Sequence, residues 1–217
     1  MRFWRWVRPI LAVVIVLSAV RSSVADWNDV PTGSMNPTIV EGDRIFVNKL
    51  SYDLKVPFTQ WRLARWSAPR RSDIIVFESP ADGQRLVKRV VALPGEIIEM
   101  RGGRLFIDGR QLEYELSAAR ADNSAVGPVT LKEDLDGHPH PIQILPHVRT
   151  MRSFSPIVVP DGHYFVLGDN RDNSLDSRYF GTVAAKLIAG KATAVVLSVD
   201  PTHYYLPRWQ RFGRSLP

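Results

Sequence analysis

The chain has 217 residues, enough to bury a sizeable core in one or two domains without disulfides or structural zinc. Hydrophobic residues make up 45% and charged residues 23% of it, an ordinary globular composition that excludes wholesale disorder. The absence of cysteine excludes thiolate nucleophiles and iron–sulfur clusters, so covalent chemistry would use Ser, Thr or Lys. A net charge of +6 suits nucleic acid or an anionic membrane equally well.

The N-terminal segment, residues 1–25, predicts membrane targeting. Three arginines within the first eight residues precede an apolar run over residues 10–20, which is shorter than the roughly 20 residues of a comfortable membrane span. Two interpretations stay open: an anchor that also recruits the aromatic residues before the run, or a signal peptide cut after Ala25, with Ser23 at position −3. In both, the basic flank stays in the cytoplasm and the chain from residue 26 onward is translocated.

Beyond residue 42, short runs of branched and aromatic residues alternate with turn residues, a pattern typical of antiparallel strands. Strands are expected over residues 44–48, 73–77, 85–93, 96–100, 104–107, 163–167 and 192–199. Glycine-containing connectors predict turns at residues 93–96, 102–103 and 108–109. Residues 182–188 could form one short helix or strand. The expected fold class is mainly β, with an antiparallel sheet.

The segment over residues 116–160 is polar and contains several Pro and His residues, and it is too long for a plain loop. It predicts a small inserted subdomain. The expected division is an N-terminal tip and membrane anchor, the first part of a catalytic β domain, the insert, and the second part of that domain with a basic tail, over residues 1–25, 26–115, 116–160 and 161–217. His138, His140 and His147 could bind a metal, although a flexible surface loop is the simpler interpretation.

Residues 31–38, PTGSMNPT, display Ser34 on a stretch that two prolines and a glycine keep extended or turning. A hydroxyl presented in this way is accessible to a substrate. The surroundings are not those of a G-x-S-x-G elbow. The alternative is a surface turn with an incidental serine.

Residues 86–93, LVKRVVAL, set Lys88 inside an apolar strand. A lysine that acts as a general base near neutral pH needs its pKa lowered by about three units. Apolar surroundings and the neighbouring charge of Arg89 are both expected to lower it. The alternative is a solvated lysine that protects an edge strand from aggregation.

Residues 167–181, LGDNRDNSLDSRYFG, are dense in side chains that hydrogen-bond to backbone, which predicts a rigid loop. A calcium loop is the alternative for so many Asp and Asn residues. Arg171 occupies a position where an oxygen ligand would be required, and the spacing to a bidentate Glu is absent, so no metal site is expected.

Taken together, PTGSMNPTIVEGD, VKRVVALPGE and GDNRDNSLDSRYFG resemble, in order, the serine, lysine and C-terminal signature boxes of bacterial type I signal peptidases, the leader peptidases. The segment RRSDIIVF resembles the intervening strand of that family. The resemblance covers about residues 28–114 and 156–200. It implies a serine endopeptidase with a Ser/Lys dyad that removes signal peptides from exported preproteins without a cofactor.

The resemblance implies that Ser34 is the nucleophile and Lys88 the general base. Ser174 would hydrogen-bond to the Lys88 amine and orient it. Asp176 and Arg178 would form an ion pair that holds the loop in place.

For the oxyanion hole, the resemblance implies the Thr32 side chain together with the Ser34 backbone N–H. Threonine is a mild departure from the hydroxyl residue usual there, because its methyl group restricts the rotamers. The family selects small side chains at −1 and −3, which a shallow apolar pocket reads by size. The positions expected to line that pocket are Val30, Met35, Ile39, Leu86 and Val87.

The expected location is the inner membrane, with a single span and the catalytic domain on the periplasmic or extracytoplasmic side. The expected partners are preprotein signal peptides and the lipid bilayer, and no nucleic acid. Trp61, Trp66 and the arginine-rich tail around Trp209 could contact lipid headgroups, or could simply be solvated charge and aromatic surface.

Three alternatives stay open. One is a specialised Ser/Lys peptidase that matures a pilin or conjugation protein. Another is a conventional triad that uses His163 or His203 with Asp169. The third is a non-catalytic basic exported protein that binds membrane or nucleic acid. The sequence identifies neither the preproteins, nor cleavage after Ala25, nor the role of the insert, nor the oligomeric state.

Overall fold

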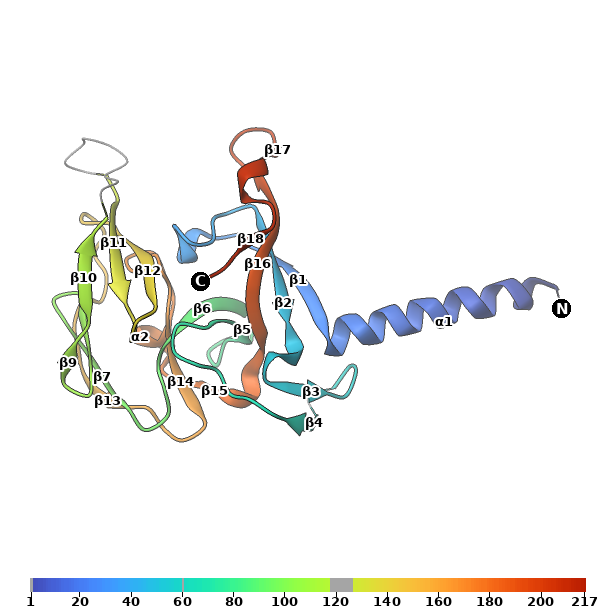
Figure 1. Ribbon diagram of the computed structural model, residues 1–217, viewed down its shortest axis with the longest axis horizontal. Helices are drawn as coiled ribbons and strands as arrows, with labels where there is room; N and C mark the ends of the chain where they lie inside the picture. The colour runs from blue at the N-terminus through green and yellow to red at the C-terminus, as the bar shows by residue number, and fades with distance from the viewer. Residues whose placement is uncertain (1, 60, 118–126) are drawn as a thin grey trace.

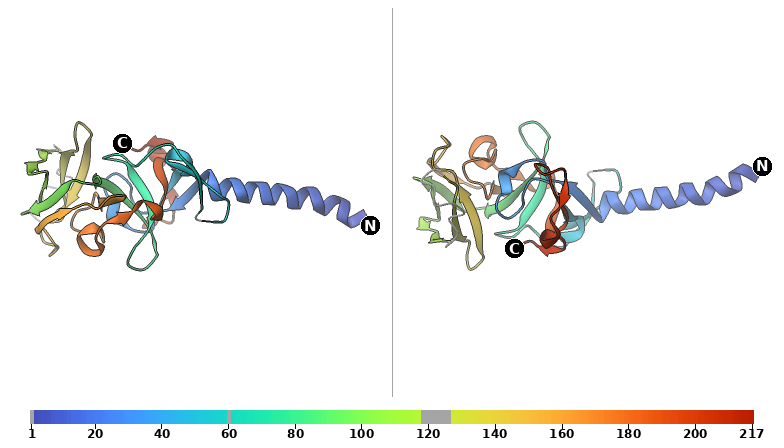
Figure 2. Two further views of the ribbon diagram at one scale, coloured as in Figure 1. Left: turned by 90° about the horizontal axis from the view of Figure 1, so that it is seen from below. Right: turned by 90° about the horizontal axis from the view of Figure 1, so that it is seen from above.

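A long helix, α1 (Arg2–Ser23), projects from one side of a two-lobed β structure (Figures 1 and 2). The computed structural model describes residues 2–59, 61–117 and 127–217. In this part of the chain, no helix meets the combined requirements of length and apolarity for a membrane span. The lobe next to α1 contains the large sheet, and the second lobe lies on the far side of it.

The large sheet is antiparallel throughout and has nine strands. Its order is β1 (Ala25–Asp29), β2 (Asp43–Asn48), β16 (Ile188–Asp200), β5 (Ile74–Glu78), β6 (Arg85–Ala92), β14 (His163–Leu167) and β15 (Val183–Ala184). Two short strands, β17 (Leu206–Pro207) and β18 (Arg214–Ser215), also pair with β16. Register shifts interrupt β16 opposite both β2 and β5, and such bulges bend a strand and increase its twist.

The second lobe contains two smaller sheets. One consists of β13 (Phe154–Val158), β7 (Ile97–Arg101), β8 (Arg104–Ile107) and β9 (Arg110–Gln111). The other consists of β10 (Glu113–Leu116), β11 (Val129–Asp134) and β12 (Pro139–Ile144). Because β13 pairs with β7, strands from both sides of residue 116 share this lobe. The domain division at residues 116 and 160 stays a prediction.

The remaining elements are short. A hairpin of β3 (Asp53–Lys55) and β4 (Arg62–Arg65) lies beside the base of α1 (Figure 1). One short helix, α2 (Ser177–Phe180), follows the loop after β14. Single turns of 3₁₀ helix occur at Gly33–Met35, Lys49–Ser51, Ala185–Leu187 and Trp209–Arg211.

Strand β14 joins the two lobes because its side chains alternate between their cores. Phe165 and Leu167 pack with the core of the second lobe. Tyr164 and Val166 pack with the large sheet. Each buried side chain of this size stabilises the fold by about 1.5–3 kcal/mol. The loop that leaves β14 is thus held between the lobes.

The predicted fold class, mainly β and antiparallel, is confirmed. All seven predicted strands are present, with boundaries shifted by a few residues. The predicted turns contain backbone with positive φ, as at Gly95 and Gly109. Residues 182–188 contain strand β15 and a 3₁₀ turn. The prediction missed β1, β3, β4, β9–β13, β17 and β18, and in β12 the Pro and His residues hide the strand pattern.

Candidate active site

Ser34 lies in the 3₁₀ turn that follows β1, and its side chain is half-buried. The flanking residues fix this turn in the core, because Met35 and Ile39 are buried in the cluster between β2, β5 and β16. The Ile39 N–H also donates a 3.0 Å hydrogen bond to the Met35 carbonyl. The hydroxyl of Ser34 is therefore presented from a short turn whose position is set by buried neighbours.

Lys88 lies on β6 opposite Ile75 of β5, and only 2% of it is exposed. Its Nζ forms a 2.8 Å hydrogen bond with Ser34 Oγ and donates to the Val87 carbonyl at 2.9 Å. Burial lowers the pKa of Lys88 to about 8, against the opposing effects of Asp176 and Asp169. The structure thus brings together the two residues that the sequence singled out as nucleophile and base.

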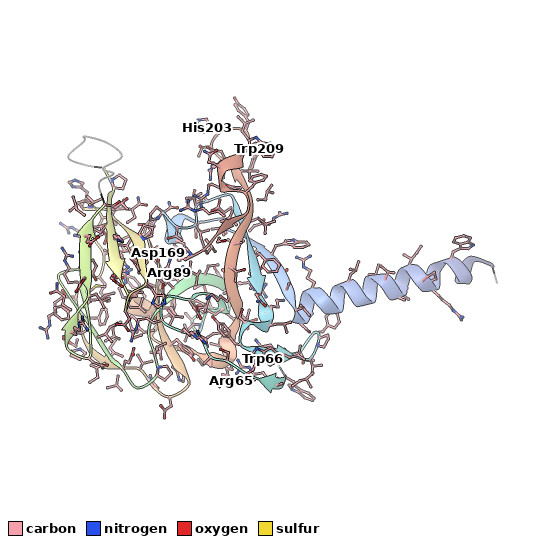
Figure 3. All side chains as sticks on the ribbon, viewed as in Figure 1. Arg65, Trp66, Arg89, Asp169, His203 and Trp209 are labelled. Carbon is pink, nitrogen blue, oxygen red and sulfur yellow. The ribbon has the colours of Figure 1, made fainter. Side chains whose placement is uncertain are left out.

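The expectation that Arg89 would help to lower the pKa of Lys88 is wrong. Arg89 points to the other side of β6, because adjacent residues of a strand face opposite ways. There it forms a two-point ion pair with Asp169, at 2.8 and 2.7 Å, and both residues are fully buried (Figure 3). The charge of Arg89 is neutralised by this pair, so desolvation is what lowers the lysine pKa.

Asp169 is held from three sides. Besides the bonds from Arg89, it accepts a 2.5 Å hydrogen bond from the Thr38 hydroxyl. Burial opposes its ionised form, but the guanidinium of Arg89 keeps the pKa of Asp169 below its usual value. This buried pair connects β6 to the loop after β14 and to the segment that follows Ser34.

Asn170 is the functional residue that the sequence reasoning missed. Its side-chain amide donates to the Gly33 carbonyl at 3.0 Å, and its backbone N–H donates to the Ser34 carbonyl at 3.1 Å. Gly168 lies close by, where an added Cβ would meet the Ser34 carbonyl at 2.4 Å. Nothing in a single sequence indicates that this loop touches the serine turn, more than 130 residues away.

Asp176 and Arg178 form the expected ion pair, with two contacts of 2.8 Å. Asp176 also accepts a hydrogen bond from the Gly168 N–H at 3.1 Å, and Arg178 donates to the carbonyls of Arg171 and Met151. The pair therefore braces both ends of the loop.

The expected hydrogen bond between Ser174 and Lys88 is not formed. Within the part of the chain that the structure describes, the Ser174 hydroxyl is buried and has no hydrogen-bond partner. The Lys88 amine is turned toward Ser34 and the Val87 carbonyl instead. Ser174 Oγ still lies in the same region, 2.3 Å from where a Cβ on Gly168 would be.

A cleft of about 420 Å³ opens over Ser34 and Lys88. Its walls come from residues 26–32 on one side and residues 84–88 on the other. Four of the five predicted pocket positions line it, namely Val30, Met35, Leu86 and Val87, together with Thr32. Ile39 is the exception, because it is fully buried in the core and does not reach the cleft.

Neither predicted histidine triad is present. The ring of His163 faces the Asp161 carbonyl, and His203 is exposed and pairs with Asp200 at 3.2 Å. Asp169 is occupied by Arg89. Among the described residues, no three His, Asp or Glu side chains are arranged to hold a metal ion.

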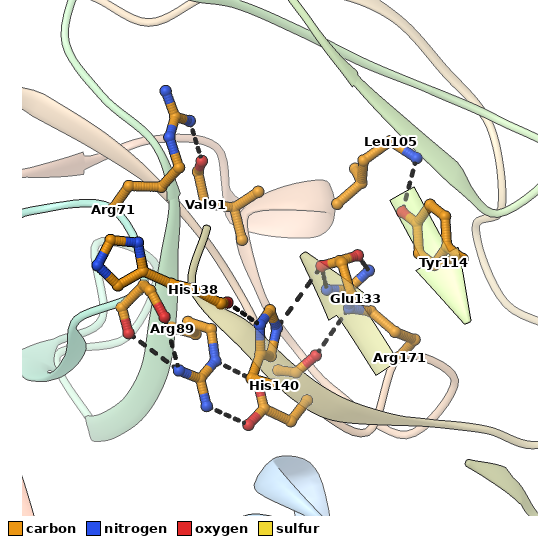
Figure 4. A network of polar contacts seen from close by, with 12 residues as sticks. Arg71, Arg89, Val91, Leu105, Tyr114, Glu133, His138, His140 and Arg171 are labelled. Carbon is orange, nitrogen blue, oxygen red and sulfur yellow. Dashed lines mark hydrogen bonds and ion pairs between the residues drawn. The ribbon is translucent and has the colours of Figure 1, made fainter. Parts of the chain in front are cut away.

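A second buried polar network lies in the other lobe (Figure 4). Arg171 forms a two-point ion pair with Glu133 of β11, and His140 Nε2 lies 3.6 Å from the same carboxylate. Burial lowers the pKa of His140 and so favours its neutral form. Because Arg171 belongs to the loop after β14, this network fastens the loop to the second lobe.

A sequence profile described as "Signal peptidase, peptidase S26" matches residues 3–197. The signal peptidase I of Pseudomonas fluorescens is 37% identical over 94% of this chain and 75% of its own length. That of Pseudomonas aeruginosa is 35% identical with the same coverage. A crystal structure of a signal peptidase I from Enterococcus faecalis is 38% identical over 58% of this chain and 98% of that chain, with a TM-score of 0.39. The chain therefore belongs to the signal peptidase family, peptidase S26, and the predicted identity as a signal peptidase is confirmed.

Proposed function

We propose that this chain removes signal peptides from exported preproteins with Ser34 as nucleophile and Lys88 as general base. The observation that carries the proposal is the 2.8 Å contact between Lys88 Nζ and Ser34 Oγ, with the lysine buried and its pKa lowered to about 8. With this pKa about a tenth of the amine is neutral at pH 7 and half of it at pH 8, and the neutral form is what a general base requires.

In the first half of the reaction, neutral Lys88 accepts the proton of the Ser34 hydroxyl as Oγ attacks the scissile carbonyl. The Lys88 ammonium then donates that proton to the leaving amine, and an acyl-enzyme on Ser34 remains. In the second half, Lys88 accepts a proton from a water molecule that attacks the ester. The proton returns to Ser34 Oγ as the signal peptide leaves with a free carboxylate.

The Ser34 N–H and the Thr32 hydroxyl are proposed to bind the oxyanion. Thr32 supports this role by its place in the cleft wall and by its side chain, which makes no capping hydrogen bond to the serine turn. Two preorganised donors of this kind each contribute roughly 100-fold or more to the rate.

The substrate is proposed to bind as an extended strand. Strand β1 forms the edge of the large sheet, and β14 pairs with β6 only from residue 89 onward, so residues 85–88 have no strand neighbour on that side within the described part of the chain. A peptide between these two edges would form backbone hydrogen bonds with both strands, as in strand addition. Val30, Met35, Leu86 and Val87 would then leave room only for small side chains next to the scissile bond.

The chain is proposed to work at the inner membrane, with α1 as a single span and the catalytic lobes on the extracytoplasmic side. The arginines at the start of α1 support this orientation. Three exposed aromatic residues support contact with the lipid interface: Phe58, whose N–H bonds to Ser22 at the end of α1, together with Trp61 and Trp66 (Figure 3 shows Trp66).

The test is cleavage of model preproteins by the full chain in detergent. The substrates carry Ala at −1 and −3, and matched substrates carry Leu at −1. Ser34→Ala and Lys88→Ala are expected to abolish cleavage, whereas Lys132→Ala, at an exposed lysine of the second lobe, is expected to retain it. Retained turnover in Lys88→Ala would refute the dyad, and cleavage restricted to one pilin-like substrate would favour a specialised peptidase.

A further inference from the structure

A second cavity lies at the base of α1, beside the catalytic cleft. Its volume is about 310 Å³. Its walls come from the C-terminal end of α1, the β3–β4 hairpin and the ends of β5 and β6 (Figure 1). The lining residues include Ser22, Lys49, Lys55, Phe58, Glu78 and Arg85.

The charges around this cavity are unbalanced on the side of Lys49 and Arg85. A single carboxylate, that of Asp26, serves three cations. Arg21 Nε lies 2.9 Å from it, whereas Lys49 Nζ and Arg85 Nη1 are at 3.5 and 3.6 Å, beyond good hydrogen-bond distance. Lys49 Nζ donates instead to the carbonyls of Arg21 and Ser22, at 2.9 and 3.1 Å, neutral acceptors that leave its formal charge without a close carboxylate. Arg85 is half exposed, so its guanidinium keeps donors for another partner.

Positive charges also outnumber negative charges on the side of the cavity that carries Lys55. Its Nζ donates to the Ile188 carbonyl at 2.6 Å, which leaves its charge uncompensated by that contact. The nearby carboxylate of Asp53 is engaged by Arg62 at 2.6 Å. With Glu78 included, three carboxylates face five cations around the cavity. The excess of two positive charges favours binding of an anion, and a singly charged anion would offset half of it.

The pKa values of Lys49 and Lys55 are both lowered, as expected for cations that are partly buried next to other cations. Burial lowers the pKa of both Lys49 and Lys55, Asp26 and Asp53 oppose the effect, and neighbouring cations add to it. Arg85 and Arg21 act on Lys49, and Arg62 and Lys49 act on Lys55. An anion placed among these groups would relieve both the repulsion and the cost of desolvation.

The rim of the cavity carries an apolar group. The backbone of Phe58 is in the left-handed region, with φ of 63°, and its N–H donates to Ser22 Oγ at 2.8 Å. This bond ties the hairpin loop to the end of α1. The Phe58 side chain is 71% exposed. The cavity could therefore bind a ligand whose charged group contacts the cations and whose apolar part contacts Phe58.

We propose that this cavity binds the phosphate group of an anionic phospholipid. A phosphodiester presents two charged oxygens, which an arginine and two lysines on different walls can contact together. The proposal rests on the proposed membrane location, because α1 as a span would place its C-terminal end, and so the cavity, at the level of the headgroups. The bound lipid would fix the orientation of the cleft relative to the membrane surface, since Asp26 and Arg85 line both the cleft and the charged cluster.

The test measures how far a lipid protects Lys55 from acetylation by a water-soluble reagent. The full chain is kept in uncharged detergent and titrated with short-chain phosphatidylglycerol, short-chain phosphatidylcholine or inorganic phosphate, and the modified peptides are quantified by mass spectrometry. Phosphatidylglycerol is expected to slow acetylation of Lys55 several-fold more than phosphatidylcholine. Equal protection by phosphatidylglycerol and inorganic phosphate would support the phosphate site but assign it to a soluble anion.

Arg85→Gln is the informative variant, and Arg110→Gln, at an exposed arginine of the second lobe, is the control matched in charge. Arg85→Gln is expected to raise the phosphatidylglycerol concentration for half-protection about fivefold, while Arg110→Gln leaves it unchanged. Identical titrations of the two variants, or equal protection by the two lipids, would overturn the proposal. Cleavage of a soluble peptide in the same detergent tests the proposed function separately, because that assay needs no anionic lipid.

Discussion

The two sides of strand β6 bury two neighbouring cations under opposite conditions. On the cleft side, Lys88 is buried against apolar side chains, Ser34 Oγ and a carbonyl, with no carboxylate in contact. On the other side, Arg89 is buried against the carboxylate of Asp169 with two short hydrogen bonds. Desolvation therefore lowers the pKa of Lys88, whereas the charge of Arg89 is compensated by the carboxylate of Asp169.

This difference indicates how reactivity and rigidity are separated within one strand. An unpaired buried amine is destabilising for the fold but suited to proton transfer. A paired buried guanidinium is unsuited to proton transfer but holds the loop that carries Asn170 against the serine turn. Removing each cation should have opposite effects on stability.

The largest effect is expected from Lys88→Met, which keeps the length of the side chain but removes the amine. Turnover should fall by about 1,000-fold or more, because the general base is lost. The pKa of Lys88 is lower in the folded state than in the unfolded state. The free-energy cost of burying the protonated lysine is therefore at its maximum at pH 7 and decreases as the pH rises from about 8 toward 10.5. The variant should therefore be more stable by about 3 kcal/mol at pH 7. Thermal unfolding and peptide cleavage, measured on the same sample, check both parts.

Arg89→Met should have the opposite effect on stability. It leaves the Asp169 carboxylate buried without its partner, which costs about 3–5 kcal/mol. The double variant Arg89→Met, Asp169→Leu should recover part of this loss, because no uncompensated charge remains. Chemical denaturation of the unsubstituted chain, both single variants and the double variant measures the coupling. An Arg89→Met variant as stable as the unsubstituted chain would show that the buried Asp169 carboxylate does not need Arg89 to compensate its charge.

The pH dependence of cleavage should follow the cleft side of β6. In the proposed mechanism the neutral amine of Lys88 is the active form, so kcat/KM should rise about tenfold per pH unit below pH 8 and level off above it. His163 and His203 do not face Ser34, so His163→Gln and His203→Gln should leave this limb unchanged. A limb centred near pH 6.5 instead would point to a histidine base.

The smallest effect on stability is expected from Ser174→Ala. No described residue hydrogen-bonds to this buried hydroxyl, so its removal should change the free energy of unfolding by no more than about 1 kcal/mol, in the stabilising direction. Ser177→Ala is the contrasting variant, because that hydroxyl accepts a hydrogen bond from the Val166 N–H at 2.9 Å. A drop in kcat for Ser174→Ala without a loss of stability would show that its bond to Lys88 forms only during turnover.

The amino-acid sequence by itself predicted five strands of the large sheet, β2, β5, β6, β14 and β16, and the turns at residues 93–96, 102–103 and 108–109. Each of these depends on residues close together in the chain, where alternation, glycine and short spacing act directly. It also indicated Ser34 and Lys88 as partners, through motifs that resemble those of a known family.

Only the tertiary structure decided which residues 50 to 140 positions apart in the chain meet. It placed Asp169 on Arg89, Asn170 on the serine turn and Ile39 in the core, and it left Ser174 without a partner. It also gathered the cations at the base of α1 around one cavity. The physical reason is that strand order and the packing of the two lobes set these contacts, and local preferences carry no information about them.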